Sequence, residues 1–295
     1  MRFESLVLIG LMLAAGAQPG RAQSPQAVYK AFGAQASRPA ATIAYGPGEL
    51  QVADLRMPEG PGPFPVAVVI HGGCWMASVD NRSGIAGFAD ALTKRGFATW
   101  NIEYRRVGDA GGGWPGTFQD IAAAEDKLAD VAATHRLDLS RVVIVGHSAG
   151  AHLALWAASR AKLPAPWNDS RVRPTAVVAI DGPGALAPFV GIDADVCGRP
   201  VIVPLMGGTP QQKPDDYRIA SPMDQLPLGM RQLLIGAALQ DLMQPYIVAA
   251  RASGDRVDVL TPPKANHFDI VTPNTVNGAA VVDFIVSTTL RADPP

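Results

Sequence analysis

The chain has 295 residues, of which 48% are hydrophobic and 17% are charged, and its 25 Lys and Arg against 26 Asp and Glu give a net charge of −1. Without a basic block it lacks the electrostatic footprint of a nucleic-acid-binding protein. Its apolar content is too high for intrinsic disorder. Two cysteines are too few for a disulfide scaffold or a four-thiolate zinc site.

Residues 1–22 have the features of a secretory signal peptide. A positive charge near the start precedes an apolar run over residues 6–17, which is too short to span a bilayer. Small residues precede a cleavage point after Ala22, and a cut after Ala17 is the alternative. We therefore expect a periplasmic or secreted protein with a mature chain of residues 23–295. An uncleaved anchor or a buried N-terminal helix is the other possibility.

After a loose stretch to about residue 44, strand and helix patterns alternate. The expected strands are residues 48–57, 66–70, 97–102, 141–145, 175–180, 232–235 and 257–260. The expected helices are residues 82–95, 118–135, 148–160, 244–253 and 275–290. This alternation predicts βαβ units, and hence an α/β fold with a mostly parallel, doubly wound sheet covered by helices on both faces.

Residues 181–230 interrupt this rhythm, because they are rich in Pro and Gly and have no clean period. We expect a short irregular insertion, or cap, over the carboxyl edge of the strands, where open α/β sheets bind ligands. No internal repeat appears, so residues 23–295 are expected to form a single catalytic domain.

Residues 146–150 (GHSAG) match the pattern G-x-S-x-G between an expected strand and an expected helix. Such a turn exposes the serine hydroxyl at the sheet edge, while the glycines leave room for neighbouring backbone. The helix N-terminus that follows favours a developing oxyanion. We therefore expect Ser148 to be a nucleophile. The alternative is a simple turn in which Ser148 caps the helix.

A serine needs a general base to become a good nucleophile. Among five histidines, His267 follows the last strand and can reach the edge of the sheet at which Ser148 lies. His135 ends a helix that precedes a strand, which places it at the opposite edge. His267 is therefore the predicted base.

The acid that orients this base is expected between the serine and the histidine in the sequence. Asp241 follows the strand at 232–235 and is the predicted acid. Asp181, at the end of the preceding strand, and Asp269, close to His267, are the alternatives. Asp241 could instead cap the helix that begins beside it.

Residues 71–75 (HGGCW) end the strand at 66–70. Glycines in such a loop let backbone N–H groups approach a substrate closely. We expect an oxyanion hole formed by the N–H groups of Gly73, Cys74 and Ala149.

Together, HGGCW, GHSAGAHLA, Asp241 and NHF resemble the α/β-hydrolase fold and, within it, the esterases with an HGG loop. The likeness covers residues 48–290. The chain is most similar to the arylformamidase branch and to the bacterial acetyl- and feruloyl-esterase-like group beside it. The segment ASPMDQLP at 220–227 is also similar to those groups. The chain departs from relatives that carry a third Gly or a Tyr where Cys74 stands.

The resemblance implies a serine hydrolase that cleaves small-molecule carboxylic esters through an acyl-enzyme, with Ser148, Asp241 and His267 as the triad. Hydrolysis of a formamide is the alternative reaction. The resemblance also implies a substrate pocket lined by Trp75, Met76 and Trp114, although aromatic and Met side chains are more often core residues. Residues 103–106 (EYRR) are expected to hold the HGG loop by hydrogen bonds.

No HExxH motif or other clustering of metal ligands occurs, and we expect neither a cofactor nor a metal. Cys74 as a nucleophile is a further alternative, but no base stands beside it in the sequence. In an oxidising compartment Cys74 and Cys197 could form a disulfide, or they could remain two free thiols. From a different class of function, a catalytically silent binding module on this fold also remains open.

Overall fold

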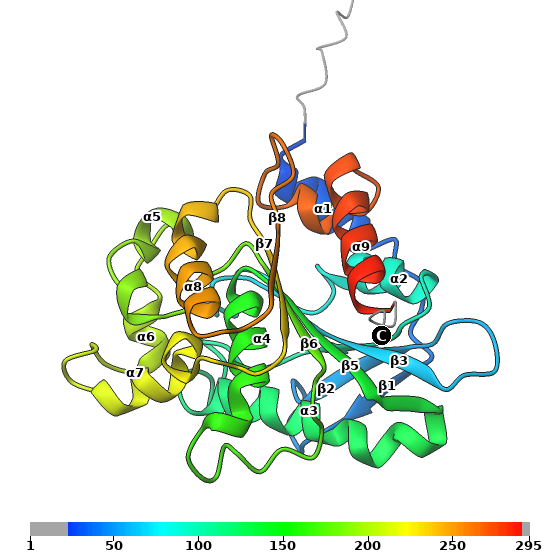
Figure 1. The fold of residues 1–295 in the computed structure, drawn as a ribbon, viewed down its shortest axis with the longest axis horizontal. Helices are drawn as coiled ribbons and strands as arrows, with labels where there is room; N and C mark the ends of the chain where they lie inside the picture. The colour runs from blue at the N-terminus through cyan, green and yellow to red at the C-terminus, as the bar shows by residue number, and fades with distance from the viewer. Residues whose placement is uncertain (1–22, 291–295) are drawn as a thin grey trace, which may run out of the picture.

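The computed structural model describes residues 23–290, so the expected signal peptide at 1–22 lies outside the described residues. Within this range eight strands form one sheet, in the order β1-β2-β4-β3-β5-β6-β7-β8 (Figure 1). The strands are β1 (Ala41–Ala44), β2 (Val52–Arg56), β3 (Phe64–Ile70), β4 (Ala98–Ile102), β5 (Leu137–His147), β6 (Ala176–Ile180), β7 (Arg231–Ile235) and β8 (Val257–Leu260).

The sheet is mostly parallel, as predicted. β1 and β2 pair antiparallel to their neighbours, and every other pairing is parallel. The strands β3, β4 and β6 are buried along their whole length, which is why β3 and β6 appear in the sequence as continuous apolar runs. The parallel order brings the carboxyl ends of β3, β5, β6 and β8 to one edge, where the candidate site lies.

Helices cover both faces of this sheet (Figure 1). One core lies between the sheet and the helices α3 (Gly116–His135), α4 (Ala149–Ser159) and α8 (Gln240–Ala252). A second core lies on the opposite face, under α1 (Pro25–Gly33), α2 (Ala86–Lys94) and α9 (Val276–Thr289). No helix in the described part of the chain is both long enough and apolar enough to span a membrane.

Two elements near the N-terminus were not expected from the sequence. Residues 25–33 form α1, whose first turn is capped by the Ser24 hydroxyl and begins with a proline, and residues 41–44 form the short edge strand β1. The stretch to residue 44 is therefore less irregular than predicted.

The insertion at 181–230 runs between β6 and β7 and is built from short helices rather than irregular loops. These are the α-helices α5 (Asp193–Cys197), α6 (Ile202–Met206) and α7 (Pro214–Ala220) and the 3-10 turns at Ala187–Phe189 and Pro222–Gln225. Helices of five to seven residues show too little periodicity to be recognised in a sequence.

Candidate active site

Ser148 occupies a sharp turn between β5 and α4, with φ 57° and ψ −122°. A left-handed conformation in a residue with a Cβ costs roughly 1–3 kcal/mol and is found where the surrounding structure enforces it. Here the backbone is packed too tightly for side chains, because a Cβ on Gly146 would lie 1.9 Å from the carbonyl oxygen of Gly150. A Cβ on Gly150 would lie 2.2 Å from the carbonyl oxygen of Ile70. The two glycines thus permit the strained turn that exposes Ser148.

Ala149 is the first residue of α4, and every residue of this helix is buried. The N–H groups of a first helical turn have no partner within the helix and carry its partial positive charge. The Ala149 N–H therefore lies beside the Ser148 side chain as a potential donor to an anion.

His267 lies in the loop after β8, and its Nδ1 donates a hydrogen bond to Oδ2 of Asp181 over 2.7 Å. Asp181 is fully buried at the end of β6, and its Oδ1 accepts from the backbone N–H groups of Ala237, over 2.7 Å, and Leu239, over 2.9 Å. Burial acts to raise the pKa of Asp181, but the hydrogen bond from His267 and the two backbone donors outweigh it and hold the pKa below its usual value. Asp181 is therefore an anion at neutral pH and orients the imidazole.

The structure places Asp181, and not the predicted Asp241, against His267. Asp241 does not pair with His267 but lies exposed in the first turn of α8, whereas Asp181, the alternative at the preceding strand end, holds the histidine. The loop after β7 still contributes to the arrangement, because its N–H groups at residues 237 and 239 bind Asp181. The signal for Asp181 was present in the sequence as a carboxylate directly following a buried strand.

His147, the residue before the serine, contacts His267 directly. Its Nε2 donates to the carbonyl oxygen of His267 over 2.8 Å, and the two rings lie 4.5 Å apart between centroids. Burial, followed by the proximity of His267, lowers the pKa of His147 to about 3. His147 is thus a neutral hydrogen-bond donor that holds the His267 loop, a role that the sequence did not reveal.

The HGG loop after β3 has three consecutive residues with positive φ: Gly73 at 107°, Cys74 at 53° and Trp75 at 55°. The residue before these three is Gly72, where the loop comes close to Ser148. A side chain does not fit there, because a Cβ on Gly72 would lie 2.9 Å from the Cβ of Ser148. The loop therefore brings Gly73 and Cys74 to the same cavity as the serine.

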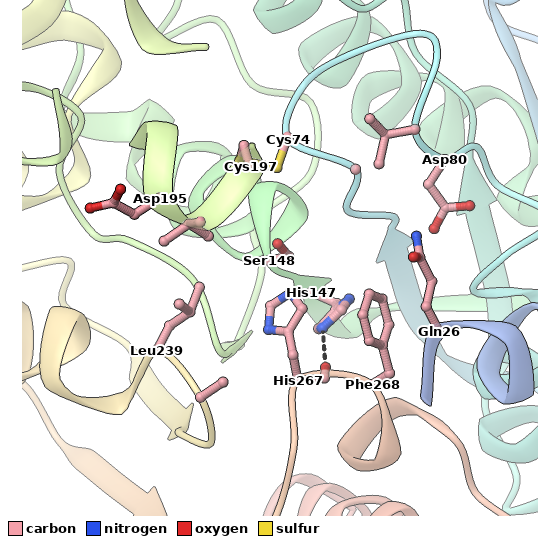
Figure 2. A pocket seen from close by; sticks show the side chains of 14 residues that line it. Gln26, Cys74, Asp80, His147, Ser148, Asp195, Cys197, Leu239, His267 and Phe268 are labelled. Atoms are coloured by element: carbon pink, nitrogen blue, oxygen red, sulfur yellow. Dashed lines mark hydrogen bonds between the residues drawn. A yellow bond between two sulfur atoms is a disulfide. The ribbon is translucent and has the colours of Figure 1, made fainter. Parts of the chain in front are cut away.

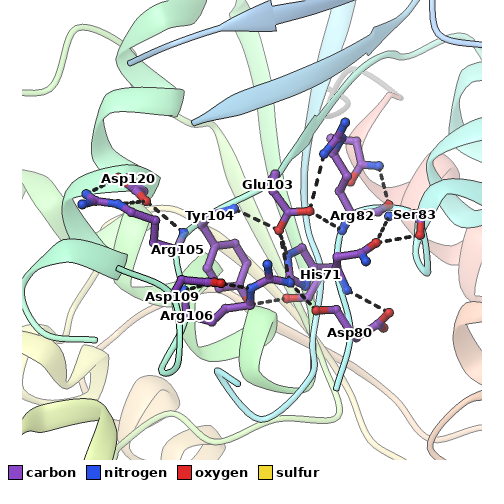
Figure 3. Close-up of polar contacts among 12 residues, drawn as sticks. His71, Asp80, Arg82, Ser83, Glu103, Tyr104, Arg105, Arg106, Asp109 and Asp120 are labelled. Atoms are coloured by element: carbon purple, nitrogen blue, oxygen red, sulfur yellow. Dashed lines mark hydrogen bonds and ion pairs between the residues drawn. The ribbon is translucent and has the colours of Figure 1, made fainter. Parts of the chain in front are cut away.

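Glu103, at the end of β4, is the centre of the polar network that supports this loop (Figure 3). Its Oε1 accepts from His71 Nε2 over 3.0 Å, and its Oε2 accepts from the Arg82 N–H over 3.1 Å. The Tyr104 hydroxyl donates to the His71 carbonyl over 2.9 Å. Burial acts to raise the pKa of Glu103, but His71 and Arg106 outweigh it and lower the pKa to about 2. The expected support of the HGG loop is confirmed for Glu103 and Tyr104, whereas Arg105 pairs with Asp120.

His71 faces an acceptor at each ring nitrogen, with Nδ1 lying 2.7 Å from the Gly72 carbonyl oxygen and Nε2 lying 3.0 Å from the Glu103 carboxylate. These two contacts hold both nitrogens of the buried ring, and the second one pairs His71 with the carboxylate at the end of β4. The pair fixes the start of the HGG loop against β4.

Cys74 and Cys197 form a disulfide, with their Cα atoms 6.1 Å apart and 123 positions separating them in the sequence. Of the two possibilities left open by the sequence, the structure therefore shows the bonded one. The bond joins the HGG loop to α5 of the insertion.

These groups surround a cavity of about 540 Å³, a size typical of small-molecule sites. Figure 2 shows Ser148 between the disulfide and the ring of His267. The cavity is lined by Gln26, Gly73, Cys74, Val79, Asp80, His147, Ser148, Asp195, Val196, Cys197, Ala238, Leu239, His267 and Phe268.

The predicted pocket residues Trp75, Met76 and Trp114 do not line this cavity. Trp75 turns into the core, where its ring meets His152 edge-on at 5.6 Å, and Trp114 packs 4.9 Å from Phe118. Met76 is half-buried and its backbone bridges to Val107. Their side chains serve packing, whereas smaller apolar residues and Phe268 line the site.

The N-terminal helix contributes to the site unexpectedly. Gln26 of α1 lines the cavity, and Tyr29 of the same helix packs 5.5 Å from Phe268 and donates to Asp80 over 3.1 Å. The only sequence signal for this helix was the Ser-Pro pair at its start, just beyond the expected cleavage point.

Between residues 23 and 290 no group of three or more His, Cys, Asp or Glu side chains could hold a metal ion. The described site brings together a serine hydroxyl, an imidazole, a carboxylate and backbone N–H groups.

The sequence matches the model of the BD-FAE family over residues 53–246, which is more than half of the chain. No curated protein matches the sequence.

Solved structures with similar folds include esterases. Esterase B from Lactobacillus rhamnosis is 20% identical with a TM-score of 0.73, over 89% of this chain and 90% of that one. A hyperthermophilic esterase from Pyrobaculum calidifontis is 19% identical with a TM-score of 0.72, over 90% of this chain and 89% of that one. A bifunctional GH43-CE protein of Bacteroides eggerthii is 24% identical with a TM-score of 0.68 over 84% of this chain, which spans 38% of the length of that protein. The likenesses confirm the predicted α/β-hydrolase fold.

Proposed function

The chain belongs to the BD-FAE family, and from this membership, the α/β-hydrolase fold and the geometry of the site we propose that it hydrolyses carboxylic esters through an acyl-enzyme. The observation that carries the proposal is the bond from His267 to Asp181 at the same cavity in which Ser148 occupies its strained turn. A nucleophile, a base and an orienting acid meet at one edge of the sheet.

In the proposed reaction, Ser148 Oγ attacks the ester carbonyl carbon while His267 Nε2 takes the hydroxyl proton. The tetrahedral intermediate then expels the alcohol, which leaves with that proton, and the acyl group remains on Ser148. Water then attacks the carbonyl carbon of the acyl-enzyme while His267 accepts a proton from it. The bond from this carbon to Ser148 Oγ breaks, His267 returns the proton to Oγ, and the carboxylic acid is released. Asp181 holds the imidazole with its proton on Nδ1 and stabilises the imidazolium.

The negative charge on the carbonyl oxygen is proposed to be stabilised by the N–H groups of Gly73, Cys74 and Ala149. Removing one such donor from an enzyme costs about 3–4 kcal/mol of transition-state stabilisation. The helix dipole of α4 acts in the same direction, since its positive end lies at Ala149.

The proposal includes export to the periplasm or medium, with residues 1–22 removed as a signal peptide. The Cys74–Cys197 disulfide supports this location, because structural disulfides persist in oxidising compartments. The N-terminal sequence of the secreted protein would test it, with a start at Gln23 expected.

The test of function is the turnover of p-nitrophenyl acetate by wild type and by Ser148→Ala. Wild type should hydrolyse the ester, and the variant should lose at least about a thousandfold in kcat with an unchanged melting curve. Retained turnover in the variant would refute the serine assignment. An N-formyl anilide in the same assay tests the formamide alternative. If the wild-type protein binds both compounds but neither hydrolyses them nor reacts with a fluorophosphonate, a silent binding module would be favoured.

A further inference from the structure

The helix α5 forms one wall of the cavity. Asp195, Val196 and Cys197, its last three residues, all line the cavity that contains Ser148, and Figure 2 shows Asp195 on the opposite side from Asp80. Val196 is apolar, remains 37% exposed and faces the cavity together with Leu239. A bound acyl chain would bury such a side chain, so this wall offers contact to part of a substrate beyond the ester carbonyl.

The wall itself is weakly packed. Between residues 191 and 200 only Asp193 is buried. The glycines on either side, Gly191 with φ 94° and Gly198 with φ 72°, have open space where a Cβ would stand. The hydrophobic core therefore contributes little to the position of α5.

The polar contacts of Asp193 do not attach the wall to the catalytic groups. Its carboxylate accepts from the backbone N–H groups of Gly191, Val201 and Ile202, at 3.0, 2.7 and 2.9 Å, so these bonds tie the first residue of α5 to the buried start of α6. The disulfide from Cys197 to Cys74 is the covalent link between α5 and the HGG loop.

The other end of the disulfide is anchored independently. Cys74 is followed by Trp75, which is buried in the core, and His71 is fixed by Glu103 and Tyr104. Breaking the disulfide would therefore free the C-terminal end of α5, which carries Asp195 and Val196, while Asp193 and the HGG loop keep their own contacts.

We propose that α5 is a specificity-determining wall for the acyl part of the ester and that the Cys74–Cys197 disulfide holds it over the nucleophile. This inference rests on the proposed ester hydrolysis. An acetyl group fills only the space beside Ser148, whereas an octanoyl chain extends to the wall. The wall should thus favour long acyl chains without taking part in the chemistry.

The experiment compares kcat/KM for p-nitrophenyl octanoate and p-nitrophenyl acetate, expressed as their ratio. Cys197→Ser should lower this ratio about tenfold, the size of effect expected when a few methylene contacts are lost. Val196→Ala, with the disulfide intact, should lower it in the same direction, so the inference stays testable if the cysteine variant folds poorly. Arg218→Ala, an exposed position in the same insertion, is the control that should leave the ratio unchanged.

Reduction gives a second readout on the wild-type protein. A dithiol such as dithiothreitol converts the S–S bond to two thiols and is itself oxidised to its cyclic disulfide, and it should bring the wild-type ratio to that of Cys197→Ser. The variant should not respond to the reductant. The specificity role would be overturned if both variants kept a ratio within twofold of wild type. An equal fall in kcat/KM for the two esters would overturn it in the same way. Absence of turnover of either ester by wild type would instead refute the proposed function.

Discussion

At the scale of single residues, the site depends on backbone positions that few side chains tolerate. Ser148 and Asp181 both have positive φ, at 57° and 49°, and each follows the end of a buried strand. From neighbouring strands, the turn at Ser148 places the serine in the cavity that His267 lines, and the turn at Asp181 brings its carboxylate to Nδ1 of His267.

The identity of the acid is tested by a pair of variants. Asp181→Asn should reduce kcat for p-nitrophenyl acetate by about 10³–10⁴, because the amide no longer holds the imidazole in the productive tautomer. Asp241→Asn, on the surface of α8, is the matched control and should retain wild-type kcat. The reverse pattern would restore Asp241 as the acid.

His147 is expected to act as a positioning residue for the base. His147→Ala removes the hydrogen bond to the His267 carbonyl and should lower kcat about tenfold with little change in KM, the value of one buried hydrogen bond. His147→Gln keeps a donor and should recover part of the loss. Because the pKa of His147 is about 3, the pH–rate profile above pH 5 should keep its shape in both variants. Equal losses in Ala and Gln would contradict this role.

The sequence was sufficient to predict that Ser148, His267 and the HGG loop meet at one edge of the sheet, because Ser148 and the HGG loop directly follow buried strands and His267 follows the last strand. It could not decide between Asp181 and Asp241, since both follow strands that end at the same edge. The choice depends on the N–H groups of Ala237 and Leu239, which close over Asp181 only in the folded chain. The lining of the cavity escaped prediction for a similar reason, because the direction in which Trp75 points depends on core packing.

At the scale of elements, the ends of β3 and β4 are joined by the Glu103 network, which holds the HGG loop through His71. The strands with continuous apolar runs were predictable, whereas β1 has only four residues and α1 only nine. Such short elements gain their stability from tertiary contacts, here with β2 and with the loop around Phe268.

The Glu103 network predicts a pH-dependent contribution to stability. The folded-state pKa of Glu103 is about 2, below its ordinary value, so its carboxylate stabilises the fold fully above about pH 4.5 and loses this effect as the pH falls toward 2. Glu103→Gln should therefore lower the free energy of unfolding by on the order of 2–3 kcal/mol at pH 7. Denaturant melts from pH 7 to pH 3 should show this difference shrinking, and a constant difference would contradict the assignment.

At the scale of the whole molecule, the catalytic edge of the sheet is separated from its main buried ion cluster. Arg160, just beyond α4, pairs with Glu125 over 2.7 Å and with Asp126 over 2.8 Å, and thus ties the end of α4 to α3. An eleven-residue helix is about 16 Å long, which places this cluster a full helix length from Ser148.

Stability and activity should therefore be separable. Arg160→Ala leaves the Glu125 carboxyl buried without its cation and should cost about 3–5 kcal/mol of unfolding free energy, measured by chemical denaturation. The kcat of the folded fraction should stay near that of wild type. Arg171→Ala removes an exposed pair with Asp130 and is the control, with a far smaller effect expected. A loss of kcat that exceeds the loss of folded protein would show coupling between the cluster and the site.

The most direct test of the account is covalent trapping of the nucleophile. Wild type treated with a fluorophosphonate should gain the mass of one phosphonyl group, and peptide mapping should place it on Ser148. Asp181→Asn should react much more slowly, whereas Asp241→Asn should react at the wild-type rate. An unlabelled wild-type protein, or a label on a residue other than Ser148, would contradict the serine mechanism proposed here.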